Sequence, residues 1–141
     1  MTDSDIPDKK IVIVISARLD KGPATNRAAV LATGLAAHVP DMIGSNLTTK
    51  DGVEILGITQ IPIPILTTKP DTSLPHLAEK AKELGCIVIV FLSRVQGMRS
   101  YEEYRQTVAQ MNYKELDIDA IALAGKTKAV TKITGNLPAL R

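Results

Sequence analysis

The stretch Lys10–Ala37, KIVIVISARLDKGPATNRAAVLATGLAA, constrains the fold more than any other part of the chain. It opens with an uninterrupted apolar run, Ile11–Ile15, that is too hydrophobic to leave one face of a strand in water. Strands buried on both faces are typical of sheets covered by helices. A polar loop follows, and then an alanine-rich segment that predicts a helix with Pro23 or Thr25 near its start. We therefore expect a layered α/β domain.

The bulk composition is that of a globular domain. A chain of 141 residues, 45% hydrophobic and 23% charged, can bury a core of its own. We expect a flexible tail over residues 1–9 and a single domain over residues 10–141. The net charge of +2 is too small to indicate nucleic-acid binding. Every apolar run is shorter than the ~20 residues that cross a bilayer, and the polar start is unlike a signal peptide, so we expect no membrane partner and a cytoplasmic location.

The rest of the chain alternates between strand and helix signals. Asp51-Gly52 predicts the turn of a small hairpin. The segment Ile58–Leu66 carries prolines at alternate positions, so it can pair along one side only and belongs at a sheet edge. The remaining predicted elements are helices over residues 73–84 and 100–111 and strands over residues 86–92, 117–124 and 129–134. Together they predict a three-layer α/β/α domain with a mixed sheet of four or five strands.

Several chemically versatile residues have structural explanations. Cys86 precedes an apolar strand, so we interpret it as a small core residue in a protein of a reducing compartment. His38 and His76 lack Cys or carboxylate partners at metal-ligand spacing, so we expect neither a metal nor a cofactor. Glu102 and Glu103 follow Ser100 in a capping-box pattern, which favours helix capping over acid–base chemistry.

Two polar turns are the candidate sites. Ligands bind beyond the carboxyl ends of strands in open α/β sheets, and helix N-termini attract anions. The turn after the first strand fits this position; the turn Gly125–Lys128 adds a cation and a hydroxyl group. If folding brings the two turns together, they form one cleft for a small anionic ligand. The predicted ligand-binding residues are Lys21, Thr25, Asn26, Arg27, Lys126 and Thr127.

Four segments resemble the uncharacterised domain of unknown function 2000 family. They are the KIVIVI strand, Asn26–Leu31, Gly57–Leu66 and Ser100–Tyr104. That family is in turn similar in fold to type-II peptidyl-tRNA hydrolase. The strand, polar loop and Ala-Ala helix at the start carry this second resemblance, together with Ala124-Gly125-Lys126-Thr127 near the end.

The resemblance to the hydrolase implies its fold without its chemistry. The positions of that enzyme's catalytic lysine, aspartate and threonine fall on Asn26, Leu123 and Thr127. A helix glutamine and histidine fall on Val30 and Thr33. A neutral amide and a leucine cannot take over the electrostatic and proton-transfer roles of a lysine and an aspartate.

The sequence therefore predicts a cytoplasmic binding module for a small anionic or phosphate-bearing ligand, and a homodimer. One alternative is a hydrolase of a tRNA-linked or nucleotide ester, with Thr127 as its catalytic residue. The other is a structural or dimerisation protein whose interface is the Pro62–Leu66 edge or an apolar helix face.

Overall fold

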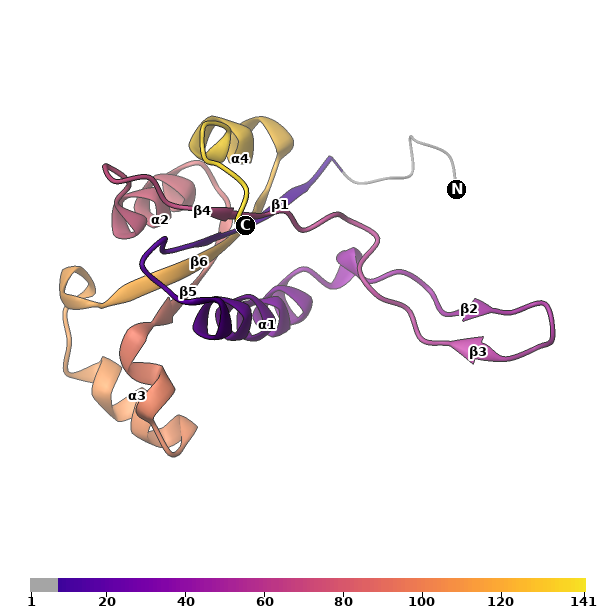
Figure 1. The fold of residues 1–141 in the computed structure, drawn as a ribbon, viewed down its shortest axis with the longest axis horizontal. Coiled ribbons are helices and arrows are strands. Elements are labelled where there is room, and N and C mark those ends of the chain that lie inside the picture. Colours follow the sequence, from indigo (N-terminus) through magenta and orange to yellow (C-terminus); the bar gives the residue numbers. More distant parts are fainter. Residues whose placement is uncertain (1–7) are drawn as a thin grey trace.

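The computed structural model describes residues 8–141, so all but the last two positions of the tail expected over residues 1–9 lie outside the described residues. A four-stranded mixed sheet is flanked by helices in one domain (Figure 1). The strands and helices follow one another as β1 (Lys10–Ile15), α1 (Lys21–His38), β2 (Leu47–Thr48), β3 (Glu54–Ile55), β4 (Ile65–Thr67), α2 (Leu74–Glu83), β5 (Ile87–Leu92), α3 (Tyr101–Ala109), β6 (Ile118–Gly125) and α4 (Thr127–Thr134). Three short 3₁₀ helices are η2 (Pro40–Met42), η3 (Ser93–Gly97) and η4 (Tyr113–Glu115).

The strand order is β4-β1-β6-β5, which confirms the predicted mixed sheet. β1 runs parallel to β4 and antiparallel to β6, and β6 runs antiparallel to β5. The central position of β1 explains its sequence, because every side chain of Ile11–Ile15 is at most 1% exposed. A strand buried on both faces needs a continuous apolar run rather than an alternating one.

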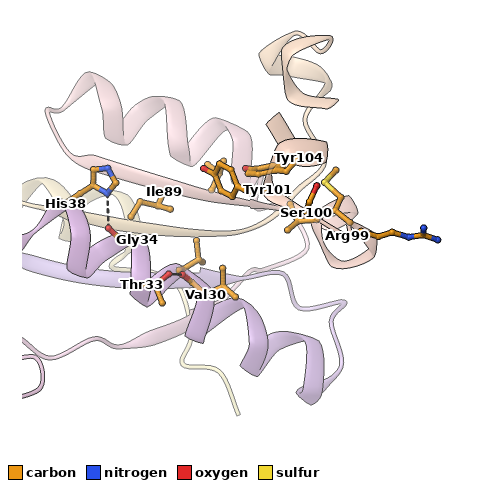
Figure 2. A pocket seen from close by; sticks show the side chains of 13 residues that line it. Val30, Thr33, Gly34, His38, Ile89, Arg99, Ser100, Tyr101 and Tyr104 are labelled. Atoms are coloured by element: carbon orange, nitrogen blue, oxygen red, sulfur yellow. Dashed lines mark hydrogen bonds between the residues drawn. The ribbon is translucent and has the colours of Figure 1, made fainter. Parts of the chain in front are cut away.

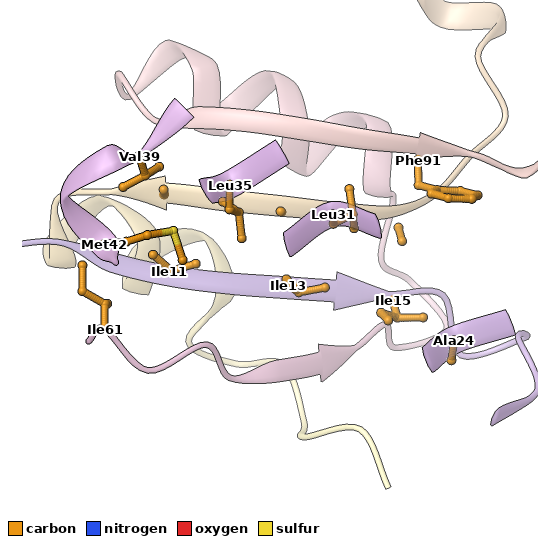
Figure 3. Packing of buried hydrophobic residues seen from close by; sticks show 13 residues of the cluster. Ile11, Ile13, Ile15, Ala24, Leu31, Leu35, Val39, Met42, Ile61 and Phe91 are labelled. Atoms are coloured by element: carbon orange, nitrogen blue, oxygen red, sulfur yellow. The ribbon is translucent and has the colours of Figure 1, made fainter. Parts of the chain in front are cut away.

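The two faces of the sheet are covered by different helices. Odd-numbered isoleucines of β1 pack under α1 against Leu31 and Leu35 (Figure 3). Even-numbered valines of β1 pack on the opposite face with Ala78 of α2 and Val130 of α4. Burying one such Leu, Ile or Val side chain contributes about 1.5–3 kcal/mol, so these two apolar layers dominate the stability of the domain.

Gly34 allows α1 to lie close to the sheet. A Cβ atom at this position would be 3.0 Å from Cδ1 of Ile89 on β5. A methyl group there would push the helix and strand apart, since cores are packed to near-crystalline density. The close packing that a glycine inside this helix predicts is confirmed.

The strand β4 forms one edge of the sheet, as the alternating Pro62 and Pro64 predict. Its outer side is not open, however. Thr67 N donates to Pro138 O and Leu140 N donates to Ile65 O, both at 2.9 Å. The C-terminal segment of the same chain therefore occupies the outer hydrogen-bonding side of β4.

The strand β5 forms the other edge, and within the described residues it pairs with β6 alone. Phe91 and Leu92 are buried, but Ile87 at its start is 37% exposed. Only the last two residues of β5 are therefore buried, and Val88, Ile89 and Val90 are partly exposed. The first residues of β5 are at least partly exposed because an edge strand has a neighbouring strand on one side only.

The segment Ala129–Thr134, expected to be a strand, belongs to the helix α4. Its buried residues are Val130, Ile133 and Thr134, which recur with helical spacing along one face. The β-branched residues favour a strand in isolation, and the apolar face packed against the sheet overrides that preference.

Serine caps start two helices as predicted. Ser73 Oγ accepts a hydrogen bond from His76 N at 3.3 Å at the start of α2. Ser100 Oγ accepts one from Glu103 N at 3.1 Å at the start of α3. The Glu103 carboxylate accepts from Arg99 N at 2.9 Å rather than from Ser100 N, so the capping box is only half formed. These contacts explain the acidic first turn of α3 structurally.

The predicted hairpin is present and projects from the body as an arm, residues 43–59 (Figure 1). One antiparallel register connects the bridge between Ile43 and Thr59 with the pair Leu47 and Ile55. Gly52 turns the chain at the tip with a φ of +90°, a conformation that favours glycine. The arm leaves the body next to the C-terminal end of α1 (Figure 1).

Candidate functional site

The two turns expected to share a cleft lie at opposite ends of the sheet. β1 and β6 are antiparallel, with Ile15 opposite Ala120 and Lys10 opposite Gly125. The turn into α1 follows the end of β1 at Ile15, whereas Lys126 follows Gly125 at the other end. The prediction of one cleft built from both turns is therefore wrong. It fails because the sequence order of two strands does not reveal whether they are parallel.

Lys126 and Thr127 have local roles at the start of α4. Lys126 is the N-cap residue, and both side chains are exposed. Near them, Lys10 Nζ donates to Thr131 Oγ1 at 3.0 Å, again at the surface. Thr127, the residue on which the enzymatic alternative depends, thus lies with Lys126 at the opposite end of the sheet from the predicted site residues on α1.

At the α1 end, a buried ion pair joins α1 to the sheet. Arg27 Nε and Nη2 donate to the two carboxylate oxygens of Asp119 at 3.2 and 2.9 Å. The side chains are only 3% and 1% exposed. This forked contact uses the planar guanidinium in the geometry that suits a carboxylate best. Arg27 was predicted to bind ligand, and its first role is to neutralise Asp119.

Two further groups hold the guanidinium of Arg27. Nη1 donates to Gln96 Oε1 at 2.9 Å, and the ring of Phe91 lies 4.4 Å from the guanidinium carbon. The cation–π contact and the amide acceptor both hold the guanidinium in place at a site shielded from water. Three of the five N–H donors of Arg27 are used in this way.

Ser93 extends the network from the other side of Asp119. Its hydroxyl group donates to Asp119 Oδ2 at 2.7 Å and accepts from Arg18 Nη2 at 3.3 Å. Asp119 O also accepts from Ser16 N at 2.9 Å, which ties β6 to the end of β1. We call Arg27, Asp119, Ser93 and Gln96 the arginine network. It links α1, β6 and η3 at the carboxyl ends of β1 and β5.

A hollow of about 510 Å³ opens beside the arginine network. Its volume falls within the range of pockets for small ligands. Polar and apolar groups share the wall, which is formed by Gly22, Pro23, Asn26, Arg27, Val30, Phe91, Val95 and Gln96. Two predicted residues, Asn26 and Arg27, therefore line a hollow at the position where open α/β sheets bind ligands.

The amino end of α1 borders this hollow. Asp20 occupies the N-cap position, but its carboxylate makes no capping hydrogen bond, and the first turn carries no acidic residue. Helix N–H groups without an internal partner attract anions. Lys21 is exposed at this point, whereas the Thr25 hydroxyl group donates to Lys21 O at 2.7 Å and is already engaged. Asn26 lines the hollow, and Lys21 directly precedes the lining residue Gly22.

Cys86 and His38 occupy structural positions. Cys86 is buried, and burial raises the pKa of its thiol, which keeps it protonated and unreactive. His38 Nδ1 lies 2.9 Å from Gly34 O in the last turn of α1. Between residues 8 and 141, no cluster of three His, Cys, Asp or Glu side chains is arranged to hold a metal ion. In the same range, no helix combines the length and apolarity needed to cross a membrane.

A family model described as "protein of unknown function (DUF2000)" matches residues 9–141. The chain belongs to the DUF2000 family. Among solved structures, its fold is similar to that of Atu0240, a protein of unknown function from Agrobacterium tumefaciens, with a TM-score of 0.85 at 19% sequence identity. The match covers 96% of this chain and 100% of that chain. No curated protein matches the sequence. The comparisons thus establish family and fold, and neither carries a named activity.

The arginine network of this DUF2000 protein is the feature that sequence reasoning missed. Asp119 was read only as part of an apolar strand. A carboxylate inside such a strand must find a cation or several donors, because burying it alone is prohibitively costly. That requirement was a usable signal for the carboxylate. The identity of its partner, 92 positions away in the sequence, was not readable.

Proposed function

We propose that this DUF2000 protein binds a small anionic or phosphate-bearing ligand in the hollow at the amino end of α1. The observation that supports it is the arginine network, which holds a buried guanidinium rigidly in the wall of a 510 Å³ hollow. Two N–H groups of Arg27 remain beyond the three that are engaged. Arg27 lines the same hollow as Asn26 and the first-turn residues Gly22 and Pro23.

Each contact has a distinct part in the proposed complex. The exposed Lys21 and the first-turn amides attract the negative charge. Asn26 orients the ligand by donating from its side-chain amide and accepting at its carbonyl oxygen. Arg27, fixed by Asp119, supplies directional hydrogen bonds rather than net charge, because its charge is already neutralised.

We further propose that the fold is similar to that of type-II peptidyl-tRNA hydrolase and that the hydrolase chemistry is absent. The support is the set of substitutions at the corresponding positions, Asn26 for the lysine and Leu123 for the aspartate. Leu123 is fully buried in β6, where no substrate could reach it. The cytoplasm remains the proposed location, since the buried free Cys86 suits a reducing compartment.

The test is a titration of the ¹⁵N-labelled protein with inorganic pyrophosphate, followed by NMR. We expect amide shifts centred on residues 21–27. Lys21→Glu should raise the Kd at least about tenfold, equivalent to about 1.4 kcal/mol. Lys126→Glu is the matched control, since it reverses the same charge at the other end of the sheet and should leave the Kd unchanged. Shifts centred on residues 126–131, or equal losses in both variants, would refute the proposed site.

A further inference from the structure

The arm exposes an unusual amount of apolar surface. Six large hydrophobic side chains on it are between 42% and 78% exposed: Ile43, Leu47, Val53, Ile55, Leu56 and Ile58. Side chains alternate between the two faces of a ribbon, so the antiparallel register of the arm places Ile43, Leu47, Val53 and Ile55 on one face and Leu56 and Ile58 on the other. The first face presents on the order of 400 Å² of apolar surface, within the size range of the largest apolar patch on typical monomers. Single exposed hydrophobic residues need no explanation, but a cluster on one projection indicates an interaction surface.

The arm is shaped by its own backbone rather than by a core. Gly57 N donates to Asn46 Oδ1, and Gly44 N donates to Ile58 O at 2.8 Å. Gly57 lies so close to the backbone of Gly44 that a Cβ atom would collide with the carbonyl oxygen. Isolated two-stranded hairpins are at best marginally stable in water. A defined ribbon with apolar side chains and no core of its own therefore points to a partner.

The same chain carries a groove that suits such a ribbon. It has a volume of about 530 Å³ and runs between α1 and α3. Figure 2 shows Val30 and Thr33 of α1 on one side and Tyr101 and Tyr104 of α3 on the other. Its floor includes Ile89 of β5. Because this edge strand pairs only with β6 among the described residues, an extended segment can add to it by backbone hydrogen bonding.

Charge also favours the arm as the occupant of this groove. The outer part of the arm carries Asp51 and Glu54 against the single cation Lys50. The groove is lined at one point by Arg99, whose guanidinium points outward from the rim and makes no salt bridge within residues 8–141 (Figure 2). The net negative charge at the tip of the arm would therefore be attracted to Arg99 of the groove, in addition to the apolar contact.

We propose that the protein is a twofold-symmetric dimer in which the arm of each copy lies in the α1–α3 groove of the other. An arm cannot fill the groove of its own molecule, because it points away from the body (Figure 1). Each of the two reciprocal contacts buries on the order of 400 Å² of the arm and a similar area of the groove, so together they exceed the ~1,200 Å² total that stable interfaces require. The twofold symmetry closes the assembly and leaves no arm unpaired.

The experiment measures the mass of the full chain by sedimentation equilibrium across micromolar concentrations. The wild type should give twice the chain mass of 15.1 kDa. Leu47→Thr/Ile55→Thr changes only exposed residues on the larger apolar face of the arm, and Thr33→Glu places a carboxylate in the groove from an exposed position. Each variant should be monomeric with an unchanged circular dichroism spectrum. Ala29→Glu, exposed on α1 but outside the groove lining, is the matched control and should remain dimeric.

Mixing the two monomeric variants tests the reciprocal geometry. The mixture retains one intact arm and one intact groove, so it should form dimers at concentrations where neither variant does alone. A monomeric wild type overturns the proposal, as does a Thr33→Glu variant that stays dimeric, since arms would then pair with arms. A monomeric wild type that sediments with vesicles of neutral phospholipid also overturns it and identifies the arm as a membrane contact. Pyrophosphate binding at residues 21–27 is scored separately, so the two proposals fail independently.

Discussion

The two ends of the sheet each carry an ion pair with the same separation, and the comparison shows that distance does not determine what a pair contributes. Arg27–Asp119 and Lys9–Asp41 both have N···O distances of 2.9 Å. The first pair is 3% and 1% exposed, the second 27% and 47%. Water screens the exposed pair, while the buried pair must replace all the hydration it lost. We therefore expect one end of the molecule to be sensitive to charge changes and the other to be tolerant.

The largest effect is expected from breaking the buried pair. Arg27→Met leaves the Asp119 carboxylate without its cation in a site that is 1% exposed, which should cost about 3–5 kcal/mol of unfolding free energy. Urea denaturation followed by circular dichroism measures this loss.

A double variant sharpens that result. Arg27→Met/Asp119→Leu removes both charges and should recover most of the stability, because well-packed apolar pairs often equal buried ion pairs. If the double variant is as unstable as the single one, the loss comes from packing against Phe91 rather than from an unpaired charge.

The next effect is expected at Ser93, which supports the same carboxylate. Ser93→Ala removes the hydroxyl that donates to Asp119 at 2.7 Å, and hydrogen bonds to charged groups contribute about 1.5–3 kcal/mol. The loss should shrink in an Asp119→Asn background, measured as a double-mutant cycle. Additive losses would show that Ser93 acts independently of the carboxylate.

The sequence was informative wherever one element alone determines the structure. The apolar run Ile11–Ile15 predicts a strand buried on both faces, which is confirmed. The helix starts at Ser73 and Ser100 depend on side chains within a few residues, so they too were readable.

Errors arose wherever the outcome depends on distant partners. The β-branched residues of Ala129–Thr134 are compatible with a strand or a helix. The burial of Val130 and Ile133 on one helical face selects the helix. The direction of β6 relative to β1 placed Lys126 at the opposite end of the sheet from Lys21. Neither residue carries local information about that pairing, so the candidate site was only half predictable.

A smaller effect is expected where no charge is involved, at the end of the sheet that holds Lys126. A Cβ atom at Gly125 would lie 2.7 Å from Cys86 Sγ, so Gly125→Ala forces β5 and β6 to shift. Overpacking of this kind costs about 1–3 kcal/mol, and thermal unfolding should register it. Cys86→Ala in the same chain removes the sulfur and should relieve part of the loss; strictly additive effects would exclude this contact as the cause.

The smallest effect on stability is expected from removing the exposed ion pair Lys9–Asp41. The pH dependence of that effect distinguishes it from other contributions of Asp41. The hydrogen bond from Lys9 lowers the pKa of Asp41 below its usual value of 3.8. A carboxyl group with a depressed folded-state pKa contributes stability above its unfolded pKa and loses it as the pH falls through the folded one. The melting temperatures of wild type and Asp41→Asn should therefore differ slightly near pH 7 and converge as the pH is lowered below 3.8.

High salt should also reduce the difference in melting temperature between wild type and Asp41→Asn, since water and salt screen the exposed ion pair. The stability loss in Arg27→Met should persist at high salt, because its ion pair is buried. A difference that survives both acid and salt would show that Asp41 acts through something other than its charge.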